Sequence, residues 1–226
     1  KKMKKVSEET GRILMVGHLL EFHPAVLKLR EMIASEQLGK INYIYSNRLN
    51  FGKVRTEENA LWSFAPHDVA VILRLIGQAP MEVSACGGSY LTKGIADTTM
   101  SNLRFSDDSR AHIFVSWLHP FKEQRLVIVG DKKMAIFNDV VPFGEKLQLY
   151  PQNVEFDGAT PLLKKEDAEF VEHANTEPLQ EECKHFLECI RTRNTPLTDS
   201  QSGIEVLKVL HACQNSIQQN GIPARL

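Results

Sequence analysis

The stretch Pro66-His67-Asp68 has the residue types best suited to chemistry. A polar loop leads through Trp62 into this stretch, and an apolar helix is expected over residues 66–76. A histidine in the first turn of a helix has its pKa lowered by the positive helix end, which leaves a neutral imidazole suited to a general base or to binding a hydroxyl group. Asp68 would tune or orient this imidazole, or favour the helix start. A packed or capping histidine fits the same pattern, so the residues alone leave both roles open.

Polar side chains near this stretch, or at the end of an expected strand, are candidates for binding a substrate. They are His18, Arg48, Asn50, Arg55, Asn59, Trp62 and Asp68. The guanidinium groups of Arg48 and Arg55 suit a sugar carboxylate or a diphosphate, although a solvated charged loop explains them equally well. For His18 the alternative is a buried, hydrogen-bonded role. His112 and His119 have no carboxylate or cysteine at ligand spacing, so no metal site is predicted.

Motifs that hold phosphates or hydrolytic nucleophiles are absent from the sequence. Gly87-Gly88 is the only glycine pair, and it lacks the G-x-G-x-x-G spacing of a dinucleotide-binding turn. There is no P-loop, no G-x-S-x-G and no H-E-x-x-H motif. We therefore expect these residues alone to hold no nucleotide.

The composition is that of an ordinary globular protein. The chain has 226 residues, of which 42% are hydrophobic and 24% charged, and its formal net charge is −1. This balance argues against a nucleic-acid or anionic membrane partner. No apolar run approaches the roughly 18 residues of a membrane span. The four cysteines form no C-x-x-C pair, so we interpret them as free thiols of a cytoplasmic protein.

Hydrophobic periodicity predicts the elements that position these side chains. Helices are expected over residues 1–11, 24–35, 66–76, 178–191 and 203–219. Strands are expected over residues 12–16, 41–50, 81–86, 98–105, 110–118, 126–129, 134–137 and 146–150. Residues 152–177 are expected to be irregular. The pattern predicts an α+β fold with a largely antiparallel open-faced sheet and helices on one face. The uncovered face suits a homodimer or homotetramer.

The order and spacing of several segments resemble the Gfo/Idh/MocA oxidoreductases, which include glucose–fructose oxidoreductase, inositol dehydrogenase and rhizopine-catabolism enzymes. The matching segments are residues 11–18, 22–25, 38–41, 61–68, 116–120 and 196–199. The resemblance extends over about residues 4–221. The block Asn-x-Leu-Trp-x-x-x-Pro-His-Asp, which begins at Asn59, resembles members that act on nucleotide-linked amino sugars.

The resemblance implies an N-terminal Rossmann domain followed by a sheet domain. It implies that residues 1–18 are the remnant of a lost dinucleotide-binding domain and that residues 19–226 form the substrate-binding and oligomerisation domain. It also implies hydride transfer between a sugar and NAD or NADP, with His67 as the catalytic histidine and a Glu-Lys-Pro lysine upstream of Lys1. This chain departs from the family at Ser63 and Ala70, where aspartates are common.

Three functions remain open from the sequence. The first is the substrate domain of an NAD(P)-dependent oxidoreductase, inactive by itself, that binds a sugar or nucleotide sugar. The second is a non-catalytic oligomerisation module of the same fold, and the third is a metal-dependent hydrolase. The block from Trp62 to Asp68 favours the first, because a scaffold has no need of it.

Overall fold

Strand β1 (Ile41–Phe51) is the centre of the fold. In the computed structural model, which describes residues 2–226, β1 lies inside a nine-stranded sheet of order β10-β7-β6-β5-β1-β4-β3-β2-β11. It pairs in parallel with β4 (Arg110–Ser116) and antiparallel with β5 (Leu118–Gly130). The remaining strands are β2 (Glu82–Gly88), β3 (Thr98–Arg104), β6 (Met134–Asn138), β7 (Leu147–Tyr150), β8 (Asn153–Asp157), β9 (Thr160–Lys164), β10 (Glu169–Phe170) and β11 (Ala224–Arg225). All neighbouring strands of the sheet are therefore antiparallel except the pair of β1 and β4.

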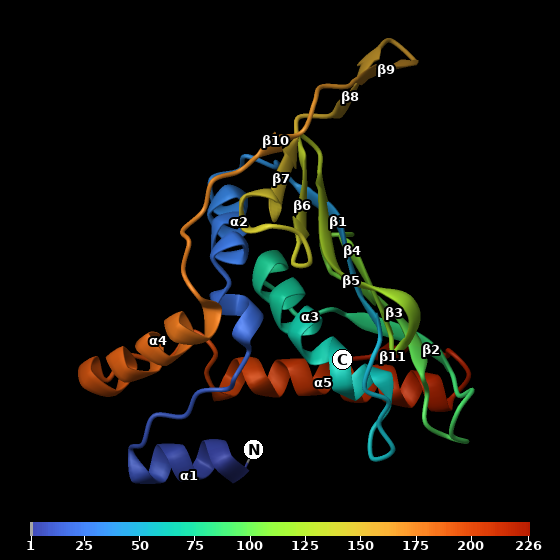
Figure 1. The fold of residues 1–226 in the computed structure, drawn as a ribbon. Helices are drawn as coiled ribbons and strands as arrows, with labels where there is room; N and C mark the ends of the chain where they lie inside the picture. Colours follow the sequence, from blue (N-terminus) through green and yellow to red (C-terminus); the bar gives the residue numbers. More distant parts are fainter. Residues whose placement is uncertain (1) are drawn as a thin grey trace.

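The described residues form five helices, three of which pack against one face of this sheet. The five helices are α1 (Lys2–Thr10), α2 (Pro24–Ala34), α3 (Ala60–Ile76), α4 (Pro178–Thr192) and α5 (Ser200–Gln218), with short 3₁₀ turns η1 (Leu19–Phe22) and η2 (Phe143–Glu145). Figure 1 shows α2, α3 and α5 on the same side of the strands. The predicted α+β fold, a largely antiparallel open sheet with helices on one face, is confirmed. No helix within residues 2–226 is long and apolar enough to cross a membrane.

Helix α3 begins at Ala60, six residues before the predicted start. The side chain of Asn59 caps it by accepting a hydrogen bond from the backbone N–H of Trp62 at 3.2 Å. Pro66 lies inside the helix, where its ring removes one backbone donor. Tertiary packing outweighs that loss, because Leu61 in the first turn is 1% exposed. The helix ends at Gly77, whose φ of 77° is left-handed and favours glycine.

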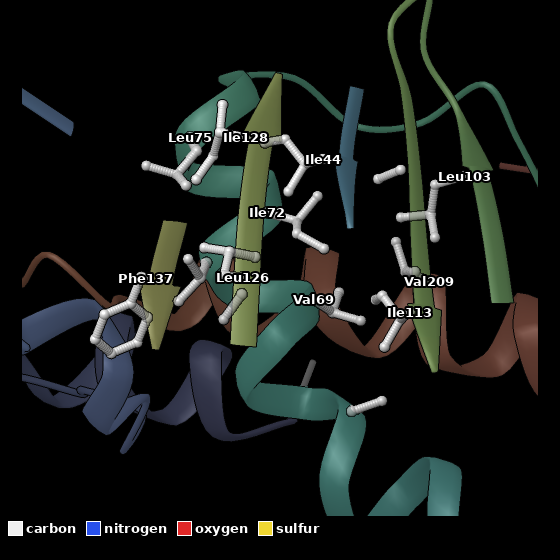
Figure 2. Packing of buried hydrophobic residues seen from close by; sticks show 14 of the residues in the cluster. Ile44, Val69, Ile72, Leu75, Leu103, Ile113, Leu126, Ile128, Phe137 and Val209 are labelled. Atoms are coloured by element: carbon white, nitrogen blue, oxygen red, sulfur yellow. The ribbon is translucent and has the colours of Figure 1, made fainter. Parts of the chain in front are cut away.

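The hydrophobic core lies between α3 and the sheet. Figure 2 shows Val69, Ile72 and Leu75 of α3 in the same buried cluster as Ile44 and Ile128 of the sheet. Burying one such side chain stabilises a fold by about 1.5–3 kcal/mol. This packing fixes α3 against the sheet and so fixes the polar residues on its other faces.

Two segments differ from the prediction. Residues 12–16 do not form a strand of the sheet: Val16 donates to the carbonyl of Thr198 at 2.8 Å, and Met15 forms a single bridge with Asp199. Residues 12–16 lie alongside the connection between α4 and α5, and their backbone hydrogen bonds go to that connection. The segment expected to be irregular contains the hairpin of β8 and β9, which projects from the body in Figure 1.

The sheet face opposite the helices is uncovered within the described chain. Side chains alternate along a strand, so the neighbours of buried Ile44 point to this other face. There Tyr43 is 40% exposed and Met100 is 52% exposed. Tyr45 stacks on His112 of the adjacent strand, with ring centroids 5.1 Å apart. An apolar surface of this kind is typical of an association face.

Candidate active site

His67 lies in the middle of α3, as the eighth of its 17 residues. The prediction that His67 opens the helix is therefore wrong. The helix end does not explain its pKa, because that effect falls off within the first turn. The pKa of His67 is nonetheless lowered, first by burial and then by the positive charge of Arg48, against the opposing effect of Asp68. Its Nδ1 atom is buried without a hydrogen-bond partner. The ring is thus a neutral imidazole at neutral pH with one nitrogen unpaired.

His18 is a second neutral imidazole near His67. The pKa of His18 is lowered to about 4, first by burial and then by the neighbouring His67 and Arg74. The residue is 6% exposed, and its Nε2 atom is buried without a partner. His18 precedes η1, where the chain turns away from its contact with the α4–α5 connection. His67 is close enough to His18 to contribute to this lowering of its pKa, so both rings belong to one site.

An ion pair between β1 and α3 holds Arg48 beside His67. Arg48 donates to the Asp68 carboxylate through Nε at 2.8 Å and through a terminal nitrogen at 3.2 Å. The Ser46 hydroxyl donates to the same carboxylate at 2.6 Å. Burial by itself would lower the pKa of Arg48, but the Asp68 charge raises it, so Arg48 stays positive. Asp68 is 4% exposed and engaged on three sides, which favours a role in positioning over direct contact with a substrate.

The start of α3 is tied to α5 by a residue that the sequence did not single out. The side-chain oxygen of Gln214 accepts hydrogen bonds from Asn59 at 2.8 Å and from the Trp62 indole at 3.1 Å. The ring of His211 packs edge-on against Trp62, with centroids 5.0 Å apart. Asn59 and Trp62 are thereby held in fixed positions. No local signal predicts Gln214, because more than 150 residues separate it from its partners.

The remaining candidates lie at the edge of this site. Arg55 donates to the Ser63 hydroxyl at 2.9 Å and pairs with Glu58 at 3.1 Å. Its side chain is 40% exposed, so it stays accessible from solvent. Asn50 lies near the end of β1 and is half-buried. The structure thus brings His18, Arg48, His67 and Asp68 together and leaves Arg55 and Asn50 at the rim.

An apolar groove opens beside His18. It has a volume of about 480 Å³ and lies between α1, residues 14–18, the start of α3 and α5. His18, Trp62 and Pro66 line it, together with Leu207, which is 48% exposed. A concave apolar surface with a few polar groups at its edge suits the ring of a ligand or a packed domain.

The described residues do not fit a dinucleotide. Gly87 and Gly88 lie at the end of β2 and pair with Thr99 and Thr98 of β3, and no helix follows them. A Cβ atom on Gly87 would come within 3.0 Å of the Thr98 carbonyl, so the glycine permits close strand pairing. No group of three or more metal-ligating side chains converges within residues 2–226. All four cysteines are unpaired.

Comparison with known proteins gives the following similarities. The profile of the GFO/IDH/MocA C-terminal domain matches residues 26–136. A 2,7-anhydro-N-acetylneuraminate hydratase of Mediterraneibacter gnavus is 26% identical over 162 residues, which cover 65% of this chain and 43% of the hydratase. A UDP-N-acetylglucosamine 3-dehydrogenase of Acidithiobacillus ferrooxidans is 24% identical over 203 residues, which cover 89% of this chain and 61% of the dehydrogenase. The chain therefore spans about half the length of these relatives.

Solved structures share the fold. A structure of the Acidithiobacillus ferrooxidans dehydrogenase superposes with a TM-score of 0.80 at 22% identity and covers 96% of this chain and 66% of its own. An inositol dehydrogenase homologue from Azotobacter vinelandii, solved with NADH and myo-inositol, has a TM-score of 0.79 at 12% identity and covers 100% and 67%. The architecture is thus shared at sequence identities too low to carry function.

Proposed function

This chain belongs to the GFO/IDH/MocA family, and from that premise we propose that it is the sugar-binding part of an NAD(P)-dependent oxidoreductase. The substrate is a sugar or a nucleotide sugar, in keeping with the names of the two relatives. In this proposal residues 1–18 are the end of a dinucleotide-binding domain and residues 19–226 form the substrate domain. The cofactor is held by another part of the protein, since these residues do not fit it.

The observation that carries the proposal is the pair of neutral imidazoles, each with a buried ring nitrogen that has no hydrogen-bond partner. His67 takes the proton of a sugar hydroxyl when the carbon that bears it is oxidised, and returns the proton in the reverse reaction. A lowered pKa keeps its ring unprotonated at neutral pH, as a base requires. Arg48 holds that state by its charge, and Asp68 fixes Arg48. His18 binds a neighbouring hydroxyl through its unpaired Nε2 atom.

The rim and the open sheet face complete the proposal. Arg55 is the accessible cation of the site and suits a carboxylate or diphosphate on the substrate. Asn50, Asn59 and Trp62 frame the entrance. The uncovered sheet face, with Tyr43 exposed, supports a homodimer or homotetramer.

The test is turnover in the protein that carries this chain together with a dinucleotide-binding domain. We expect sugars or nucleotide sugars to be oxidised or reduced with a matching change in nicotinamide absorbance. A panel should contain UDP-N-acetylglucosamine, N-acetylglucosamine and myo-inositol, each with NAD and with NADP. If none of these changes the absorbance while the protein still oligomerises, the non-catalytic oligomerisation module is the better description.

A further inference from the structure

A second cavity lies beside η1. It has a volume of about 570 Å³ and is lined by η1, the loop between β6 and β7, and residues 175–180 before α4. In Figure 1 the connection from β10 to α4 runs down past α2 and closes this side of the molecule. His18 and His23 flank η1 at its two ends. Leu19, the residue that follows His18, also lines the cavity, so the cavity extends along η1 toward His18.

One wall of this cavity is a network of paired charges. The Lys146 ammonium donates to the Asp139 carboxylate at 2.5 Å and to the Asp139 carbonyl at 2.7 Å, which leaves a third N–H free. His23 accepts the backbone N–H of Ala25 at its Nδ1 atom, so the proton of the neutral ring sits on Nε2, 3.6 Å from Asp139. Burial lowers the pKa of His23 to about 4, and the ring is neutral. This wall offers both donors and acceptors at little net charge.

The cavity also has an apolar lining that includes Phe143, and the ring of His173 supports Phe143 from outside the lining. Phe143 packs on the ring of His173, with centroids 4.5 Å apart and planes tilted by 32°. Nδ1 of His173 lies 3.1 Å from the carbonyl of Val171, which fixes the ring. Leu19 and Leu20 extend the apolar surface. The lining thus combines paired polar groups with aromatic and aliphatic side chains. Such a lining matches a ligand that is apolar on its ring faces and polar around its edge.

We propose that this cavity binds a neutral, hydroxyl-rich ring, the chemistry of a sugar. An anion is disfavoured because Asp139 and Glu177 both border the cavity and only Lys146 opposes them. A cation is disfavoured because both carboxylates are already engaged: Asp139 pairs with the Lys146 ammonium, and Glu177 accepts the backbone N–H of Gln180. Asn175 and Gln180, both exposed at the mouth, supply amide groups that match hydroxyls. The ring is either a free sugar or the non-reacting sugar of a larger substrate whose other end lies at His67. Only this last identification rests on the proposed function.

The test uses the 226-residue chain and the histidine ring signals in two-dimensional NMR. Titration with N-acetylglucosamine is expected to shift the signals of His23 and His173 to saturation. The double variant Asn175→Ala/Gln180→Ala should weaken this binding roughly tenfold, through the loss of two hydrogen-bonding groups. Both positions are exposed, so the fold is kept. Gln218→Ala, which removes an exposed amide at the end of α5, is the matched control and should leave binding unchanged.

Titrations with UDP and UDP-N-acetylglucosamine show whether the ring is a free sugar or part of a larger substrate. They also separate this proposal from the proposed role of His67. UDP without the sugar should leave the signals of His23 and His173 in place. UDP-N-acetylglucosamine should shift these signals together with those of His18 and His67 if the ring is part of a larger substrate, and without them if the site takes a free sugar. The proposal is overturned if N-acetylglucosamine shifts neither His23, which lines the cavity, nor His173, which packs on Phe143. It is also overturned if UDP shifts these signals, or if the double variant binds as well as the control. A loss of turnover in a His67 variant bears on the proposed function alone.

Discussion

Replacing Arg48 by methionine is expected to destabilise the fold strongly. The Asp68 carboxylate is 4% exposed and Arg48 supplies two of the three hydrogen bonds that it accepts, at 2.8 and 3.2 Å. Removing one partner of a buried ion pair leaves the other charge unpaired and costs about 3–5 kcal/mol. That is a large share of a typical domain stability of about 5–15 kcal/mol. The Ser46 hydroxyl, at 2.6 Å, cannot replace the lost charge.

Urea unfolding measures this loss, and three variants separate its causes. Arg48→Lys keeps a charge but loses the two-point contact, so it should lose less than Arg48→Met. Arg48→Met/Asp68→Leu removes both charges and should recover most of the stability. NMR titration supplies a second readout: the pKa of His67 should rise in Arg48→Met, because the Arg48 charge lowers it in the native chain. The reasoning is refuted if Arg48→Met costs less than about 1 kcal/mol, or if the double variant is as unstable as the single one.

Three further outcomes are expected. Unfolded His18 takes up a proton below pH 6.5, whereas the folded residue does so only near pH 4. His18 alone should therefore lower the unfolding free energy by about 3 kcal/mol as pH drops across this window, in addition to the contribution of His23. His18→Gln should remove that part of the slope in urea unfolding, and an unchanged slope would contradict the assignment. Met100→Glu, at a position 52% exposed on the open sheet face, should give a monomer by light scattering and change monomer stability by less than about 0.5 kcal/mol. A calorimetric titration of the 226-residue chain should detect no binding of NAD or NADP, and micromolar affinity would show that the residues do form a dinucleotide site.

Periodicity predicted most helices and strands because their buried faces repeat at 3.6 or 2 residues. The helix over residues 24–35 is observed as Pro24–Ala34, and the strand over residues 41–50 as Ile41–Phe51. Helix α3 begins earlier than its local sequence pattern indicates. Pro66 suggests a helix start by its own chemistry, whereas the observed start depends on the Asn59 cap and on contacts with α5. Such tertiary contacts leave no local pattern.

The roles of the candidate site residues stay predictions, and the structure changes the physical cause assigned to the pKa of His67. His67, His18, Arg48 and Asp68 are brought together as a site requires, yet the pKa of His67 is lowered by burial and Arg48, not by a helix end. The Arg48–Asp68 pair joins residues 20 positions apart on different elements, so only the fold reveals it. The same holds for the insertion of β1 between β4 and β5, since a parallel pairing has no signature in the strand sequences.

The most direct test of the account is His67→Asn, with turnover and unfolding free energy measured on the same variant. The protein should be the one that joins this chain to a dinucleotide-binding domain. Asparagine is smaller and can still form hydrogen bonds, so the free energy of unfolding should change little. Loss of a general base should lower turnover by roughly 100-fold or more, with a much smaller change in substrate affinity. An unchanged turnover number, once corrected for the folded fraction, would contradict the proposal that His67 moves the proton.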